Sequence, residues 1–127
     1  MTTSERVFEY LKGQGLAPER RDSGNIVFKY EMLTFLFVAF DDDEQFFDLT
    51  LPGIYDVDDE NCMDVFEAIN EVNETTKVVK LTISGDEVWC CAEIMLDSTP
   101  ELDDLIPRLV GILTKSRLKF YNYIENN

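Results

Sequence analysis

Residues 77–96 constrain the fold more than any other stretch, because apolar and polar residues alternate there on both sides of a Gly-Asp pair. Alternation with a period of two is typical of a β-strand that buries one face. Gly85-Asp86 suits the tight connection of a β-hairpin. The returning strand separates an apolar face from a second face that holds Trp89, Cys91, Glu93 and Met95. The chain is therefore expected to build an antiparallel sheet.

Helix and strand patterns follow one another along the remaining residues. Apolar spacing predicts helices over residues 4–12, from Asp58 or Asp59 to 73, and from Ser98 or Thr99 to about 124. Strands are predicted over residues 25–31, 32–40 and 45–51, and the second of these is apolar on both faces, as in a central strand covered on both sides. Residues 18–24 resemble a loop, Pro52-Gly53 ends a strand, and Pro107 predicts a bend or restart in the last helix.

These elements predict one α+β domain over residues 1–127. We expect a five-stranded antiparallel sheet and three helices in the order α-β-β-β-α-β-β-α. We expect no secretion signal, and the longest apolar run is far shorter than the ~20 residues that span a bilayer. Three cysteines do not form a disulfide framework, so a bacterial cytoplasm with reduced thiols is expected.

The charge is concentrated in the middle of the chain. The sequence has 26 acidic and 11 basic residues and a net charge of −15. No lysine or arginine occurs between Tyr30 and Thr76, a stretch that holds 14 of the acids. Nucleic acid and anionic membranes need basic residues for binding, so both are poor partners for this chain. The acidity favours a basic peptide or a cation, or else serves only to keep the protein soluble.

Several classes of catalytic site are excluded by composition. The chain has no histidine, so it cannot form a Ser-His-Asp or Cys-His nucleophilic system by itself. It has too few cysteines for a four-cysteine zinc site and no glycine-rich phosphate loop. Cys90-Cys91 is not a CxxC redox motif, and we interpret these two residues and Cys62 as small buried apolar side chains. The sequence therefore predicts no cofactor, no metal and no enzyme.

Two alternatives to a binding module stay open. Asp56, Asp58, Glu60 and Glu67 match positions one, three, five and twelve of a calcium loop, although Asn61 replaces the usual glycine. Capping of the following helix explains the same acids without calcium. A carboxylate enzyme would need an acid with a raised pKa, and Asp48 and Glu93 are the candidates because they lie on strands. We favour exposure to solvent opposite the core as the explanation for both residues.

Apolar residues that point away from the core predict a surface for another protein. Trp89 and Met95 lie opposite the apolar face of their strand, and the 32–40 segment is apolar on both sides. We therefore predict partner contacts at Trp89, Met95, Leu36 and Val38. An acidic tetrad follows the 32–40 segment and comprises Asp41, Asp42, Asp43 and Glu44. This tetrad either attracts basic partners or protects an aggregation-prone strand.

The order of elements resembles the type III secretion chaperone-like fold, and in particular the YbjN-type family of bacterial proteins, described as candidate sensory transduction regulators. The resemblance is carried by AINEVN at residues 68–73, KVVKL at 77–81, the Gly85 hairpin, residues 88–96 and the helix at 102–120. Asn70 and Asn73 most resemble the family pattern, and by themselves they indicate local backbone bonding at a helix end. The resemblance implies an acidic homodimer that holds another protein, with no catalytic residues to carry over.

Overall fold

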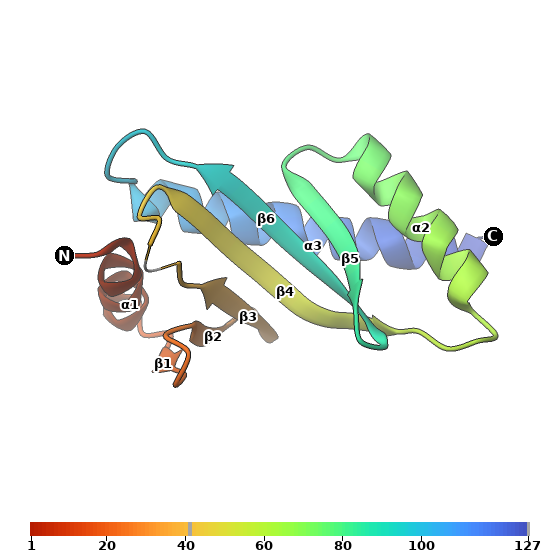
Figure 1. Cartoon of the computed structure of the whole chain (residues 1–127), viewed down its shortest axis with the longest axis horizontal. Coiled ribbons are helices and arrows are strands. Elements are labelled where there is room, and N and C mark those ends of the chain that lie inside the picture. Colours follow the sequence, from red (N-terminus) through yellow and green to blue (C-terminus); the bar gives the residue numbers. More distant parts are fainter. Residues whose placement is uncertain (41, 127) are drawn as a thin grey trace.

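A six-stranded antiparallel sheet and three helices make up the computed structural model, which describes residues 1–40 and 42–126 (Figure 1). The elements in chain order are α1 (Thr3–Gly13), β1 (Glu19–Arg20), β2 (Ile26–Tyr30), β3 (Leu33–Val38), β4 (Phe46–Asp56), α2 (Cys62–Thr75), β5 (Val79–Ser84), β6 (Glu87–Met95) and α3 (Leu102–Asn126). The strands lie side by side in the order β1-β2-β3-β4-β6-β5. The antiparallel sheet and the three helices agree with the sequence-based expectation.

The prediction of five strands is wrong, because the chain forms an additional strand, β1, within the segment predicted as a loop. Its two residues are charged and exposed, so they carry no apolar alternation that would indicate a strand. Pairing comes from the hairpin that follows, in which the N–H of Arg21 donates to the carbonyl of Asn25 at 2.7 Å. Gly24, at φ +92°, provides the left-handed position that closes this turn.

Strand β4 continues beyond the point where Pro52-Gly53 was expected to end it. The pairing with β6 shifts register between Leu51 and Tyr55, which marks a β-bulge. Gly53 has φ +61°, a conformation that a glycine adopts without steric cost. The bulge lets one long strand run past the proline, and Leu51 and Ile54 are buried on its two sides.

Helix α3 runs from Leu102 to Asn126 without the restart that Pro107 was expected to cause. The proline lies near the N-terminal end of the helix, where few backbone bonds precede it. The helix also begins later than Ser98 or Thr99, since the carbonyl of Glu101 accepts the first bonds from Asp104 and Leu105. Among the described residues, no helix combines the length and apolar character that crossing a bilayer requires.

The core lies between one face of the sheet and the helices, and we call this side of the sheet the covered face. Figure 1 shows α3 running behind β4, β6 and β5. Alternate strand residues point into this layer and are fully or almost fully buried, among them Phe28, Phe35, Phe37, Phe47, Leu49, Leu81, Val88, Cys90 and Ala92. From the helices, Leu11, Val72, Leu113 and Phe120 are buried against them. The tyrosine hydroxyl of Tyr121 ties α3 to β4 by donating to the carbonyl of Ile54.

Candidate protein-binding face

The opposite side of the sheet, which we call the open face, presents the alternate residues of the same strands. Cross-strand register places Val27, Leu36, Thr50, Cys91 and Lys80 in one row across five strands. A neighbouring row holds Val38, Asp48 and Glu93. Leu36, Val38 and Trp89 are half-buried, which differs from the full burial of their neighbours Phe35, Phe37 and Val88. The expectation that β3 is covered on both sides is therefore wrong.

Three apolar side chains form a row at one end of the open face. Phe46 is the cross-strand partner of Met95, and the rings of Phe40 and Phe46 pack edge to face with centroids 4.9 Å apart. Met95 is 68% exposed and Phe40 is 37% exposed. Exposed apolar side chains that cluster in this way are typical of a contact surface. Sequence patterns did not place Phe46 and Phe40 on this face. Each lies two residues from a residue of the same face, Asp48 and Val38 respectively, and this spacing indicated their position.

The centre of the open face carries charge. Asp48 and Glu93 lie directly opposite each other on β4 and β6. Glu93 forms an ion pair with Lys80 of β5, and Asp48 accepts a hydrogen bond of 2.7 Å from the hydroxyl of Thr50. Like charges at directly opposed positions repel each other, and the two partners reduce that repulsion. The open face is thus an apolar row beside a polar centre.

Burial raises the pKa of the Asp48 carboxyl above its ordinary value of 3.8, and the bond from Thr50 opposes this rise in part. The nearby charge of Glu93 raises the pKa further. Asp48 is only 8% exposed, so its expected exposure to solvent is wrong. The structure does bring together the two acids that a carboxylate enzyme would need. That function stays a prediction, since closeness of two acids does not define a substrate.

Cys91 differs from the other cysteine of its pair in position. Cys90 points into the core and is fully buried, whereas Cys91 lies on the open face and is half-buried. Cys62, at the start of α2, is also half-buried. The interpretation of all three as buried side chains is therefore correct only for Cys90. Burial, together with the charges of Asp48 and Glu93, raises the pKa of Cys91 to about 12. A thiol with this pKa is a poor nucleophile at neutral pH.

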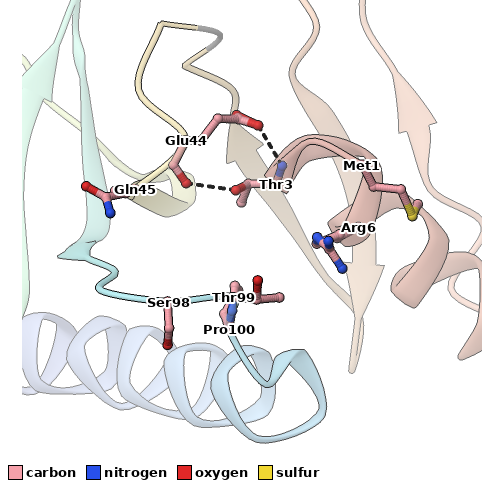
Figure 2. A pocket seen from close by; sticks show the side chains of 8 residues that line it. All are labelled: Met1, Thr3, Arg6, Glu44, Gln45, Ser98, Thr99 and Pro100. Carbon is pink, nitrogen blue, oxygen red and sulfur yellow. Dashed lines mark hydrogen bonds between the residues drawn. The ribbon is translucent and has the colours of Figure 1, made fainter.

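The acidic tetrad borders the apolar row, but part of it is engaged in holding the fold. Asp41 lies outside the described residues, and Asp42 is exposed. The carboxylate of Asp43 accepts from the N–H of Gln45 at 3.2 Å, within the turn between β3 and β4. Glu44 binds the start of α1, because its carboxylate accepts from the N–H of Thr3 at 2.9 Å (Figure 2). Asp43 and Glu44 therefore have a structural role in addition to their charge.

A cleft of about 240 Å³ lies beside Glu44, where α1, the β3–β4 turn and the β6–α3 loop meet. Figure 2 shows Thr3 and Arg6 on one wall, with Ser98, Thr99 and Pro100 on the other. The carbonyl of Glu44 also accepts from the hydroxyl of Thr3 at 2.8 Å. The two bonds between Thr3 and Glu44 therefore tie the start of α1 to the β3–β4 turn at this cleft.

The candidate calcium residues do not converge. The carboxylate of Asp58 accepts from the N–H groups of Glu60 and Asn61, at 2.9 and 2.8 Å, so it closes the turn before α2. The side chain of Asn61 bonds back to Asp58 and to the carbonyl of Asp56. Within residues 1–40 and 42–126, no group of three or more acidic or cysteine side chains is placed to hold a metal ion. Asp58 therefore stabilises the turn that leads into α2, but the N-cap residue of the helix is Asn61, which makes no side-chain capping bond, so the acids do not cap α2 directly.

Comparison with solved structures places the fold. A crystal structure of an uncharacterized protein from Methanothermobacter thermautotrophicus matches with a TM-score of 0.67 and 14% identity, over 98% of this chain and 97% of the other. YbjN from E. coli, proposed as a transcription regulator, matches with a TM-score of 0.67 and 8% identity, over 91% of this chain and 87% of its own. The chain has a YbjN-like fold. No family model and no curated protein matches the sequence.

The structural similarity supports a YbjN-like fold across nearly the whole chain, which is the coarser part of what the resemblance implied. Identities of 14% and 8% show a shared fold and carry no residue roles from either protein. The functional argument for this chain therefore depends on its own open face.

Proposed function

We propose that this YbjN-like protein is a non-enzymatic protein-binding module, chaperone-like or regulatory, that holds another polypeptide on the open face of its sheet. The observation that carries the proposal is the apolar row of Phe40, Phe46 and Met95 on a sheet face that differs from the core face in its exposure. Leu36 and Val38 on β3 and Trp89 on β6 add further half-buried apolar side chains to the same face, around its polar centre. Aromatic and methionine side chains are enriched at the centres of protein interfaces.

The charge beside the apolar row favours a partner with basic residues. Asp42 and Asp43 are exposed in the turn that follows β3, next to Phe40. Complementary charge mainly accelerates association and selects partners, while buried apolar contacts supply most of the affinity. A basic amphipathic segment meets both requirements, because its apolar side can cover Met95 while its charges face the acidic turn.

A matched pair of methionines gives a direct test. Met95 on the open face is 68% exposed and Met63 on α2 is 65% exposed, so replacement of either by glutamate disturbs the core little. Affinity capture from native lysate, followed by mass spectrometry, is compared for the unmodified protein, M95E and M63E. We expect a set of captured proteins that M63E retains and M95E loses. Capture that M95E retains in full, or no specific capture by any of the three, contradicts the proposal.

The homodimer implied by the family resemblance is a separate part of the proposal. Light scattering coupled to gel filtration measures the mass in solution, and we expect a dimer. If the open face forms the dimer contact, M95E shifts the mass toward the monomer while M63E does not. A monomeric mass for the unmodified protein at high concentration contradicts the dimer and leaves the binding of other polypeptides to be decided by the capture experiment.

A further inference from the structure

A cleft of about 600 Å³ lies at the β1–β2 edge of the sheet, at a distance along the strands from the apolar row. One wall is the segment from Gly15 to Ala17, and the other is formed by Val27 and Lys29 of β2 with Thr34 of β3. Gly15 and Ala17 have φ of +75° and +47°, so the backbone turns away from β2 before β1 begins. A φ of +47° is uncommon for a residue other than glycine, and Ala17 lines the cleft in this conformation.

Among the described residues, the hydrogen-bonding pattern leaves one backbone position of β2 unpaired within this cleft. The N–H of Arg21 donates to Asn25, and register pairs Glu19 with Val27, so every second residue of β2 from Asn25 faces β1. The next such residue is Lys29, whose partner in a longer β1 would be Ala17. Strand β1 begins only at Glu19. The N–H and carbonyl of Lys29 therefore point into the cleft, whereas those of Phe28 face β3.

The charges around the cleft are opposite in sign to those of the chain as a whole. Residues 1–30 hold five basic and four acidic residues, in a chain with a net charge of −15. Arg21 and Lys29 both line the cleft, and Glu19 is the acid beside them. In the part of the chain that the structure describes, neither Arg21 nor Lys29 forms an ion pair. An occupant with a carboxylate would supply the missing partner.

We propose that this cleft, the β2-edge slot, binds an extended polypeptide segment that carries an acidic side chain. One residue of the segment pairs with the N–H and carbonyl of Lys29, as an added strand does at a sheet edge. A carboxylate on the neighbouring residues contacts Arg21 or the Lys29 ammonium. The slot depends on the proposed function only in that the occupant is a polypeptide. It is separate from the apolar row and has the opposite charge preference.

Two substitutions of one residue distinguish backbone pairing from charge. K29P removes the N–H that points into the slot, and an edge strand tolerates proline where the N–H faces outward. K29A removes the ammonium and keeps the N–H. The probe is a fluorescent blocked heptapeptide in which valine alternates with glutamate, and binding is followed by fluorescence anisotropy. We expect K29P to weaken binding about tenfold, because it removes both the N–H that pairs with the segment and the ammonium that contacts its carboxylate.

The lysine counterpart of the probe tests the charge preference, and we expect it to bind about tenfold more weakly than the glutamate peptide, because Arg21 and Lys29 repel it. We expect K29A to lie between the unmodified protein and K29P. M63E, on the far helix, should bind as the unmodified protein does. Equal binding by K29P and K29A, equal binding of the two peptides, or no binding at millimolar peptide overturns the slot. None of these results bears on the capture experiment with M95E.

Amide hydrogen exchange gives a second measurement that needs no variant. In the free protein, we expect the amide of Lys29 to exchange much faster than that of Phe28, because only the latter is bonded within the sheet. The glutamate peptide should slow exchange at Lys29 and leave Phe28 unchanged. A slow Lys29 amide in the free, dilute protein contradicts the unpaired edge. Slow exchange that appears only as the protein is concentrated shows that a second copy fills the slot and overturns the proposed occupant.

Discussion

The side-chain amide of Asn73 binds both the N–H and the carbonyl of Leu81, as a residue of a neighbouring strand would. Its carbonyl oxygen accepts from the N–H of Leu81 at 2.7 Å, and its NH₂ group donates to the carbonyl of Leu81 at 3.1 Å. Asn73 lies on α2, and Leu81 lies on β5, which is an edge of the sheet. The helix therefore occupies the hydrogen-bonding groups at the middle of an edge that would otherwise be available to another chain.

Replacement of Asn73 by alanine should lower the free energy of unfolding by about 2 kcal/mol, since two hydrogen bonds of about 1 kcal/mol each are lost. Urea denaturation measures this change. N70A is the matched control, because Asn70 lies on the same helix and is exposed, and we expect a change within about 0.5 kcal/mol. Equal effects of the two substitutions would show that the Asn73 bonds contribute no net stability.

The turn between β2 and β3 stores strain that a substitution can relieve. Glu31 and Met32 have φ of +49° and +72°, and Met32 is 97% exposed at the tip. Two-residue turns of this shape favour asparagine followed by glycine, because other residues pay a steric cost in the left-handed region. The double substitution E31N/M32G should therefore raise the free energy of unfolding by about 1 kcal/mol in urea denaturation.

The hairpin between β5 and β6 gives the opposite test, in which a glycine at positive φ is replaced. Gly85 has φ +65°, and an added Cβ would meet no atom within 4 Å, so only the backbone conformation opposes a side chain there. G85A should lower the free energy of unfolding by about 1 kcal/mol. If G85A is neutral, positive φ costs little in this protein, and the gain expected from E31N/M32G should then disappear as well.

The sequence predicts a strand correctly where apolar and polar residues alternate, and misses a strand that lacks this alternation. The Gly85 hairpin was predicted correctly, with Trp89 and Met95 on the face opposite the core, because alternation reports directly which side chains are buried. Strand β1 was missed because Glu19 and Arg20 are both exposed, so no burial pattern exists to be read. Its formation depends on pairing with β2, and pairing is a tertiary property that single residues do not encode.

The candidate site shows the same division. Sequence patterns placed Leu36, Val38, Trp89 and Met95 away from the core, and their half-buried or exposed positions agree with that. The pairing of Asp48 with Glu93 could not be predicted, because it requires the register between β4 and β6. For the same reason, the empty edge position at Lys29 becomes visible only when the length of β1 is known.

Ionisation of Asp48 should make the stability of the protein depend on pH. Burial raises the pKa of Asp48 in the folded state above its ordinary value of 3.8, so the folded protein binds this proton more tightly than the unfolded chain does. The contribution of Asp48 to stability therefore falls as the pH rises from below 3.8 through the folded-state pKa, and stays low above it. D48N removes this titration and keeps an oxygen that can accept from Thr50.

We expect D48N to be more stable than the unmodified protein at pH 7, and the difference to shrink as the pH falls through the folded-state pKa of Asp48 towards 3.8. Urea denaturation at a series of pH values measures both. D42N provides the comparison, because Asp42 is exposed in the β3–β4 turn, and its effect should stay within about 0.5 kcal/mol. A D48N variant that is less stable than the unmodified protein at pH 7 would show that the ionised carboxylate stabilises the fold.

The cysteine pair should be protected from alkylation in the native state. Burial raises the pKa of Cys90 and Cys91 to about 12, and the charges of Asp48 and Glu93 add to the effect at Cys91. At pH 8 only about one in ten thousand of such thiols is ionised, and the thiolate is the reactive form. Iodoacetamide at pH 8 should therefore leave both residues unmodified during a period in which the urea-unfolded chain reacts at all three cysteines, as mass spectrometry of peptides would show.

In D48N, the thiol of Cys91 loses a neighbouring negative charge and should react faster, while Cys90, which points into the core, should not change. Rapid native labelling at Cys91 would mean that this part of the open face is more accessible and less negative than the structure indicates.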